Sequence, residues 1–310
     1  MERTKLSTWN FLLSNNFSPN LPLYVASSAN LKARTLILVL TANSRLLTRK
    51  LMSSHSEPFS ILLVNYRTLR LTSLCMGLLK KHLDVQMNDI VVVDNGSDDE
   101  SLDYLRSLDW ITLVERTQSK GAPAFISHGE ALDEGLKHVK TSRVCLLHTD
   151  TFIHDPKVFD LLHSALDGSQ VAAAGAKYQR HRRIHKRAFR IVKKASRYYT
   201  RKLLIGLRLS ASEPKPYRDP YLKSFCCMWD VDLIRKTGLK FSTGSKNPGY
   251  EMQDTLQNEG FRFIDVGTAA MFRYLSHVQS GTVVEINRSI LNKRRHSDYE
   301  RIVRETISAI

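Results

Sequence analysis

Short apolar segments alternate with amphipathic segments along this chain of 310 residues, and this alternation restricts the possible folds most strongly. Within each apolar segment, several consecutive residues are apolar, which is typical of strands that are buried on both faces of a parallel sheet. Residues at helical spacing follow them, and such strand–helix–strand units connect through right-handed crossovers. The sequence therefore predicts an α/β fold with a mostly parallel central sheet flanked by helices. The predicted strands are Ser60–Tyr66, Asp89–Asp94, Trp110–Glu115 and Arg143–Asp150.

Polar side chains stand directly after three of these strands. Tyr66 and Arg67 follow the first strand, Asp94 to Ser97 follow the second, and His148 to Asp150 follow the fourth. The carboxyl ends of parallel strands share one edge of the sheet, and open α/β sheets bind their ligands at this edge. The sequence therefore predicts a binding site formed by these residues.

Two of these carboxylates allow alternative interpretations. Asp94 can accept hydrogen bonds from a nucleotide base or ribose, or it can belong to a turn that caps the next helix. Asp150 can hold a divalent cation that neutralises a diphosphate leaving group, or it can cap the following turn. The flanking His148 and His154 do not have the spacing of a zinc site. Spacing leaves both interpretations of each carboxylate open.

The net charge of +16 is concentrated in two segments. Twelve Lys and Arg and no acid lie between Lys177 and Lys202, and residues 1–58 carry a net +5, which leaves −1 for the rest. A fold built around nucleic acid would be basic more uniformly, so nucleic acid is not an expected partner. The apolar content of 42%, the lack of a long apolar run and the four scattered cysteines are typical of a soluble protein in a reducing compartment. We therefore expect a cytoplasmic protein.

Residues 1–58 lack a sustained hydrophobic period, and strong patterning begins only near Phe59. Met52 begins the sequence MSSHSEPFSILLVNY, which is typical of a natural protein start. The segment can be a disordered tail, a targeting peptide or upstream sequence, although a signal peptide fits badly because basic residues follow its apolar run. We expect residues 1–58 to be a poorly structured or dispensable extension.

The strand-end motifs match those of a known family when they are combined with two later blocks. The turn after the second strand fits most closely, and HTD keeps only the last acid of a metal-binding DxD motif. From about Ser60 to Thr282, the chain resembles the family-2-like GT-A glycosyltransferases. The matching blocks are Asn65–Tyr66, VVVDNGSDD at Val91–Asp99, HGEALDEGL at His128–Leu136, HTD at His148–Asp150, YEMQDTLQNEGFRF at Tyr250–Phe263, and His277.

The resemblance implies a GT-A fold, the fold of nucleotide-diphospho-sugar transferases, over residues 59–285. The basic segment 177–204 would be a helical insertion in this domain, and residues 286–310 would form a C-terminal helical tail. The implied activity is transfer of a hexosyl-type sugar from a nucleotide-diphosphate donor to an acceptor hydroxyl, with inversion. The acceptor would be a glycan or a lipid-linked precursor, in glycan or glycolipid biosynthesis.

The resemblance also implies roles for individual residues. Asn65 and Tyr66 would belong to the donor nucleotide site, where Tyr66 would stack on the base. Asp94 would bond to the base or the ribose, with Ser97 nearby in the same turn.

The implied cofactor is a divalent cation, Mn²⁺ or Mg²⁺, bound to the donor diphosphate. Asp150 would be one ligand and His277 a second. His148 stands where the family has the first acid of the motif, so metal dependence stays open. A histidine suits Mn²⁺, whereas basic side chains could hold the diphosphate without a metal.

An inverting transferase also needs a base that deprotonates the acceptor hydroxyl. The acidic helix is the natural source, although Pro248 and Gly249 stand where the family has an adjacent Glu-Asp pair. Counting back from Gly260 aligns Glu251 with the family's second acid, and Asp254 follows it on the same helical face. We predict Glu251, then Asp254, as the base. The alternative is an exposed acidic helix turn.

Trp229 and Asp230 give a weaker prediction for the acceptor side. They lie in SFCCMWDVDL at Ser224–Leu233, an apolar strand that the family places under the acceptor site. The Trp229 ring would pack on a sugar there, with Asp230 beside it. The alternative is that Trp229 is a core residue.

The basic segment Lys177–Leu204 places apolar residues at helical spacing among Lys and Arg. Three interpretations are open: a solvated helix that packs its apolar stripe on the core, a helix that contacts an anionic membrane surface through residues 180–202, or a polyanion-binding helix. A peripheral position at the inner face of a membrane is therefore a further expectation. The main alternative function is a catalytically degenerate nucleotide-binding-fold protein that binds membrane or nucleic acid through this helix. A nucleotidyltransferase is disfavoured because the first strand lacks a following glycine-rich basic loop.

Overall fold

The computed structural model describes residues 57–85, 88–118, 121–181, 184–209, 212–214, 216–244, 246–286, 293–308 and 310. The chain divides into two units, Met1–Ser54 and His55–Ile310. The predicted N-terminal extension lies almost entirely outside the described residues. The following description therefore concerns the second unit.

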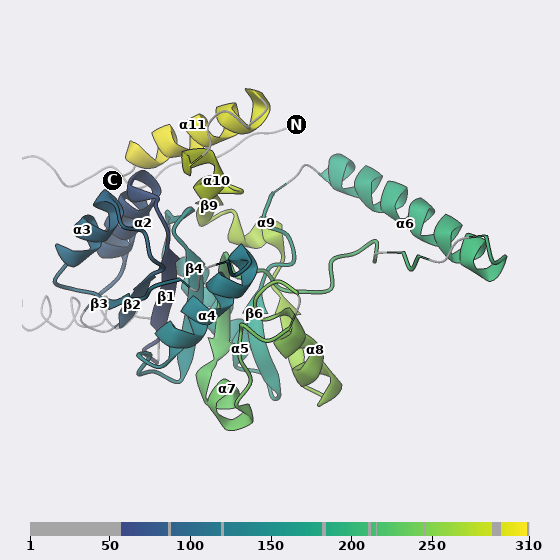
Figure 1. The fold of residues 1–310 in the computed structure, drawn as a ribbon, viewed down its shortest axis with the longest axis horizontal. Helices are drawn as coiled ribbons and strands as arrows, with labels where there is room; N and C mark the ends of the chain where they lie inside the picture. Colours follow the sequence, from purple (N-terminus) through teal and green to yellow (C-terminus); the bar gives the residue numbers. More distant parts are fainter. Residues whose placement is uncertain are drawn as a thin grey trace, which may run out of the picture. The chain divides into compact units, whose positions relative to one another are not determined.

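A seven-stranded sheet forms the centre of this unit (Figure 1). The strand order is β3-β2-β1-β4-β7-β6-β8, with parallel pairing of β1 with β2 and β4, of β2 with β3, and of β6 with β8. Only β7 runs antiparallel to its neighbours β4 and β6. The predicted mostly parallel α/β sheet is confirmed. The strands are β1 (Ser60–Asn65), β2 (Ile90–Asp94), β3 (Thr112–Glu115), β4 (Arg143–His148), β6 (Val171–Gly175), β7 (Cys226–Asp230) and β8 (Arg262–Asp265).

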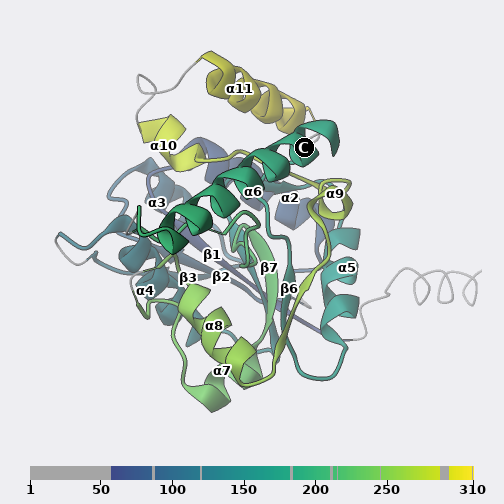
Figure 2. The same cartoon turned by 90° about the vertical axis from the view of Figure 1, so that its right-hand side faces the viewer.

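Helices cover both faces of the sheet (Figures 1 and 2). Successive strand residues point to opposite faces, so Ile61 packs in one buried apolar cluster and Leu62 in the other. The first cluster includes residues of α2 (Leu69–His82), α3 (Glu100–Arg106) and α5 (Lys157–Leu166). The second includes residues of α4 (Ala124–Leu136), α7 (Val231–Thr237) and α8 (Tyr250–Asn258).

Gly135 lets α4 approach the sheet closely. A Cβ atom at this position would lie 2.3 Å from Cδ1 of Leu62 and 2.7 Å from Cγ2 of Val93. Both contacts are shorter than carbon atoms tolerate, so any side chain here would push α4 away from β1 and β2.

A second, two-stranded sheet joins distant parts of the chain. β5 (Thr151–Ile153) pairs antiparallel with β9 (Leu275–His277), and the register places Thr151 opposite His277. Short α9 (Thr268–Met271) and α10 (Gly281–Ile286) flank β9 in the sequence. This pairing brings a residue near the C-terminus to the end of β4.

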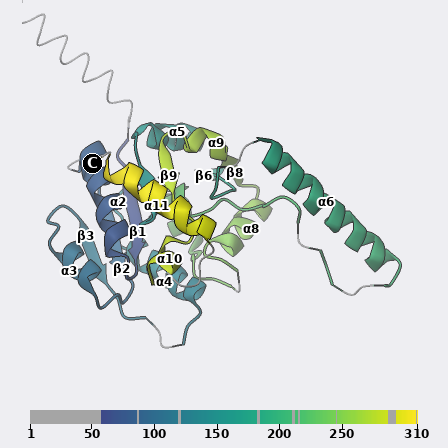
Figure 3. The same cartoon turned by 90° about the horizontal axis from the view of Figure 1, so that it is seen from above.

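The C-terminal helix α11 (Lys293–Ile307) packs beside α2 (Figure 3). Tyr299 and Val303 are buried, and the Arg70 guanidinium of α2 lies 5.7 Å from the centre of the Tyr299 ring. Arg70 also lies 3.7 Å from the Glu300 carboxylate. The described part of the tail is therefore helical and anchored to the domain.

The basic segment forms α6 (Ile184–Gly206), which extends away from the sheet instead of lying along a face of it (Figures 1 and 3). Several large apolar side chains of α6 are exposed, among them Phe189 at 69%, Val192 at 67% and Leu203 at 63%. Ile191, Ala195 and Tyr198 are half-buried, so α6 covers only part of its apolar surface and the first interpretation of this segment holds only in part. Among the helices of the described part of the chain, none has the length and apolar character needed to cross a membrane.

Candidate active site

The predicted site residues lie along one edge of the large sheet. β1, β2, β4 and β6 end at this edge, and β7 begins there because it runs antiparallel to β4. Along the strand order, Asp94 of β2 comes first, followed by Asn65 of β1 and His148 of β4. The segments before β7 and after β6 complete the row. The residues predicted to bind the donor nucleotide therefore lie on one side of His148. The segments before β7 and after β6 lie on its other side.

Asp94 is the centre of a buried hydrogen-bond network. Its Oδ1 accepts from Nδ2 of Asn65 at 2.8 Å and from the Ser97 hydroxyl, and its Oδ2 accepts from the Ser97 backbone N–H at 3.0 Å. All three residues are buried. The turn that contains Asp94 also caps the next helix, because Asp99 accepts from the Ser101 backbone N–H at the start of α3, although Asp94 itself is not the cap. The structure brings Asn65, Asp94 and Ser97 together, and their contact with a nucleotide remains a prediction.

Tyr66 follows this network and is partly exposed. The neighbouring Arg67 lies with its guanidinium 5.4 Å from the centre of the Tyr66 ring. Arg67 is fixed in turn, because its Nε donates to the Ser97 backbone carbonyl at 2.8 Å. The tyrosine ring therefore lies beside the Asp94 network with part of its surface accessible, as base stacking requires.

Arg116 is a site residue that the sequence did not single out. It follows β3, and its guanidinium donates to Oδ1 of Asn95 at 2.6 Å and to Oε2 of Glu130 at 2.7 Å. Gln118 holds the same turn, since its side-chain amide donates to the Asn95 backbone carbonyl at 2.6 Å. These contacts fix the turn after Asp94. A single arginine after a short strand carries no local signal of such a role.

The centre of the edge holds a cluster of His148, Asp150 and His277 whose ligand atoms all lie within 4.8 Å of one another. Oδ1 of Asp150 lies 3.3 Å from Nδ1 of His277 and 3.8 Å from Nδ1 of His148. This oxygen is buried and receives no hydrogen bond from the described residues. A buried carboxylate oxygen without a donor fits a divalent cation, which would complete its coordination. The cluster can therefore hold a cation.

Several contacts fix the orientation of these side chains. The β5–β9 pairing places His277 next to the Asp150 segment, and Nδ1 of His277 lies 3.0 Å from the Thr151 hydroxyl. The Gly281 backbone N–H donates to Oδ2 of Asp150 at 2.9 Å. A Cβ atom at Gly281 would lie 2.7 Å from Cβ of Asp150, so glycine permits this approach. These contacts act as the outer support that metal ligands need.

His148 receives its support from the segment before β7. Its Nε2 lies 3.0 Å from the Ser224 hydroxyl, and its backbone N–H donates to the Phe225 carbonyl. Burial lowers the pKa of His148 to about 3, although the nearby Asp150 opposes this shift. The imidazole is therefore neutral near pH 7, which is the form that donates a lone pair to a cation.

His128 of α4 lies next to the cluster and was not predicted as a site residue. Its ring centre is 5.5 Å from that of His148, and its Nε2 is buried without a hydrogen-bond partner among the described residues. Burial lowers the pKa of His128 to about 4, with Asp150 again opposing. Asp150 itself is ionised: burial raises its pKa, but His277, His148 and the Gly281 N–H together lower the pKa below its usual value.

The two acids of α8 differ in their surroundings. Oδ2 of Asp254 accepts from Nζ of Lys246 at 2.6 Å and from the Tyr221 hydroxyl at 2.9 Å. The hydrogen bond to Asp254 raises the pKa of Lys246. Glu251 is partly buried in the first turn of α8, with its carboxylate packed against Gly244. Asp254 is therefore held in a surface ion pair with Lys246.

Trp229 and Asp230 lie away from this site. The β4–β7 register places Trp229 opposite Val144 and Asp230 opposite Arg143, at the start of β4, whereas the site is at the end of β4. Trp229 is buried at 2% exposure against Phe241 and Phe263, and Asp230 caps α7. An acceptor contact at either residue does not fit this placement. Trp229 and Asp230 lie at the opposite edge because β7 runs antiparallel to β4, and the apolar pattern of β7 does not reveal this direction.

Residues 77–224 match the sequence model of Glycosyl transferase family 2. Over these residues the chain is similar to the family 2 glycosyltransferases. The match covers just under half of the chain and includes Asp94, His148 and Asp150. Glu251, Asp254 and His277 lie outside the matched residues. No curated protein matches this chain.

The solved structures that are similar to this chain share little sequence with it. A mannosyltransferase from Pyrobaculum calidifontis, in complex with GDP-Man and Mn²⁺, has a TM-score of 0.48 and 16% identity over 67% of this chain and 54% of its own. TarS from S. aureus has a TM-score of 0.45 and 14% identity over 81% of this chain and 71% of its own. Glucosyl-3-phosphoglycerate synthase from Mycobacterium tuberculosis has a TM-score of 0.42 and 15% identity over 83% of this chain and 80% of its own. The chain thus spans about half the length of the mannosyltransferase.

Proposed function

We propose that this protein is a glycosyltransferase that moves a hexosyl group from a nucleotide-diphosphate donor to an acceptor hydroxyl, with inversion, in glycan or glycolipid biosynthesis. The observation that carries the proposal is the order of groups along one sheet edge. The Asp94 network lies on one side of the buried His148–Asp150–His277 cluster. A nucleotide on the Asp94 side would direct its diphosphate to the cluster and its sugar toward the segments beyond it.

The donor nucleotide would bind between Tyr66 and the Asp94 turn. The partly exposed Tyr66 ring offers a stacking surface for the base. Asp94 already accepts hydrogen bonds from Asn65 and Ser97, so this network is rigid before any ligand binds. Such preorganisation lowers the entropic cost of binding.

His148, Asp150 and His277 would hold the divalent cation, whose chemistry is to neutralise the charge that develops on the diphosphate leaving group. This ligand set has two imidazoles and one carboxylate. Mg²⁺ prefers oxygen ligands throughout, whereas imidazole nitrogen suits transition metals. The replacement of the first motif acid by His148 therefore favours Mn²⁺ over Mg²⁺.

Glu251 would be the base that accepts the proton of the acceptor hydroxyl. Asp254 is the second candidate, and its carboxylate accepts hydrogen bonds from Lys246 and Tyr221. A carboxylate in an ion pair has less capacity to accept a further proton.

Replacement of Glu251 by glutamine tests this assignment, because glutamine keeps the shape of the side chain and removes its basicity. We expect kcat for transfer to fall by about 10²–10⁴-fold, the usual contribution of a general base, with KM little changed. The matched control is Asp254→Asn on the same helix face, for which we expect a loss of less than about 10-fold. Equal losses in the two variants, or a larger loss in Asp254→Asn, would reject Glu251 as the base.

We further propose that α6 places the enzyme at an anionic membrane surface. The helix exposes Phe189, Val192 and Leu203 on one side, and the exposed Lys193 and Arg197 border that side. A helix with one apolar side and one basic side lies in the plane of the lipid headgroups, with the apolar side inserted and the charges near anionic groups. This position suits an enzyme that acts on a lipid-linked acceptor.

A further inference from the structure

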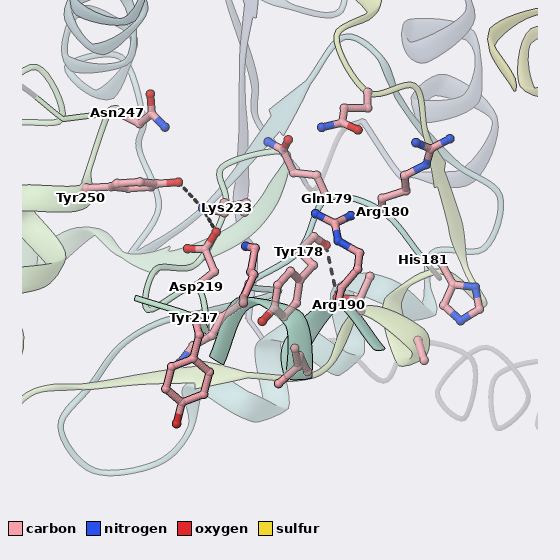
Figure 4. A pocket seen from close by; sticks show the side chains of 16 residues that line it. Tyr178, Gln179, Arg180, His181, Arg190, Tyr217, Asp219, Lys223, Asn247 and Tyr250 are labelled. Carbon is pink, nitrogen blue, oxygen red and sulfur yellow. Dashed lines mark hydrogen bonds and ion pairs between the residues drawn. The ribbon is translucent and has the colours of Figure 1, made fainter. Parts of the chain in front are cut away.

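A pocket of about 420 Å³ lies at the far end of the site edge from Asp94 (Figure 4). It is formed by the segment after β6, α6, the segment before β7 and the start of α8. Its lining residues include Lys177, Arg180, Arg190, Lys194, Asp219 and Lys223.

Two short stretches of chain connect the lining of the pocket to the cation cluster. Lys223 of the lining precedes Ser224, whose hydroxyl lies 3.0 Å from Nε2 of His148. Gln279 of the lining lies two residues after His277. The donor network lies on the other side of His148, at the ends of β1 and β2. The pocket is therefore on the side from which an acceptor would approach.

The lining is strongly basic, and part of this charge has no internal counterion. Arg180 pairs with Asp298, and Lys223 pairs with Asp219 at 2.8 Å. Within the described part of the chain, no carboxylate pairs with Lys177, Arg190 or Lys194. Asp219 is the lining carboxylate, so the pocket retains an excess of positive charge.

Neutral hydrogen-bonding groups lie among these cations. The tyrosines Tyr217 and Tyr250 and the amide of Asn247 line the same pocket (Figure 4). Tyr250 is fixed in place, because its ring stacks on Tyr221 at 4.2 Å between ring centres and its hydroxyl bonds to Lys223. Cations beside hydroxyl and amide groups suit a ligand that carries both a phosphate and sugar or polyol hydroxyls.

We propose that this pocket binds the phosphate group of an anionic acceptor, and that Lys177, Arg190 and Lys194 are its charge partners. The proposal rests on the proposed function, since only a transferase needs an acceptor beside the cation cluster. The phosphate belongs either to a soluble sugar or polyol phosphate or to a lipid headgroup. Arg190 and Lys194 come from α6, the helix that also exposes the apolar side chains.

The test compares two triple variants of the full chain that lose the same charge. The first replaces Lys177, Arg190 and Lys194 by alanine. The matched control replaces Lys140, Lys236 and Lys240, which are exposed and lie outside the pocket lining. Binding is measured by titration calorimetry with inorganic phosphate and with glycerol 3-phosphate. A second arm measures sedimentation with vesicles of phosphatidylcholine and phosphatidic acid against vesicles of phosphatidylcholine.

We expect the pocket variant to bind phosphate probes at least about 10-fold more weakly than the control variant, since each charge-assisted hydrogen bond contributes on this scale. A difference confined to glycerol 3-phosphate and inorganic phosphate assigns a soluble acceptor, and one confined to phosphatidic acid vesicles assigns a lipid acceptor. Equal affinities of the two variants in both arms, or no binding by the unmodified chain, would overturn the proposal. Slow hydrolysis of a nucleotide sugar by water without an acceptor tests the proposed function separately, because it requires only the donor side.

Discussion

Replacing Asp150 by alanine should reduce sugar transfer by at least about 100-fold while the fold is retained. Asp150 supplies the carboxylate of the His148–Asp150–His277 cluster, and its Oδ1 is buried without a hydrogen-bond donor in the described part of the protein. Loss of a group that stabilises the charge developing in a transition state costs about 10²–10³ in rate. The measurement is transfer or donor hydrolysis with a nucleotide sugar and Mn²⁺.

Asp109→Ala is the control for this variant, because Asp109 is an exposed carboxylate outside the site. Its activity should match that of the unmodified enzyme, and circular dichroism should show that both variants are folded. Activity of a folded Asp150→Ala variant within a few-fold of the unmodified enzyme would contradict a role for the cluster. In that case basic side chains would hold the diphosphate without a metal.

Replacing Phe189, Val192 and Leu203 together by serine should reduce binding to anionic vesicles by at least about 100-fold. These α6 side chains are 69%, 67% and 63% exposed, so each can insert into a lipid surface. Full burial of such a side chain contributes about 1.5–3 kcal/mol, so three of them account for the expected loss even if insertion is partial. Serine keeps the charge of the helix, and sedimentation with vesicles measures the change in partition.

The matched control replaces Val283, Ile307 and Ile310 by serine, which are also exposed but lie outside α6. This control should sediment with vesicles as the unmodified protein does. Equal vesicle binding by the α6 variant and this control would reject the membrane assignment. A change from dimer to monomer in the α6 variant would instead assign the apolar side to a second copy of the chain.

The central strands were predictable because their burial on both faces leaves a simple pattern. The apolar runs that end at Asn65, Asp94 and His148 form β1, β2 and β4, and their carboxyl ends carry the site. The order of strands beyond β4 was not predictable in this way. β7 is as apolar as the parallel strands, so its sequence gives no sign that it runs antiparallel. For this reason the prediction for Trp229 placed it at the wrong edge.

The cation cluster was only partly predictable, since it depends on contacts between distant segments. Asp150 stands in a local motif, but His277 reaches it only through the three-residue pairing of β5 with β9. Gly281, which donates to Asp150, and His128, which packs beside His148, have no local signal. Helical spacing likewise predicted that α6 is amphipathic, but whether its apolar side is covered depends on tertiary structure.

Thermal stabilisation of the full chain by nucleotide sugars tests most directly whether the site binds such a donor together with a divalent cation. UDP-, GDP-, CMP- and dTDP-sugars would each be added without metal, with Mg²⁺ and with Mn²⁺, to the unmodified chain and to Asp150→Ala. A ligand at 100 times its dissociation constant adds about 2.7 kcal/mol to the free energy of unfolding, which is a readily measured shift in Tm. We expect one nucleotide class to stabilise the unmodified chain, more strongly with Mn²⁺ than with Mg²⁺. Asp150→Ala should lose the metal-dependent part of this stabilisation. If no nucleotide sugar stabilises the chain under any metal condition, the proposed glycosyltransferase function would be contradicted. A catalytically degenerate binding protein would then be favoured.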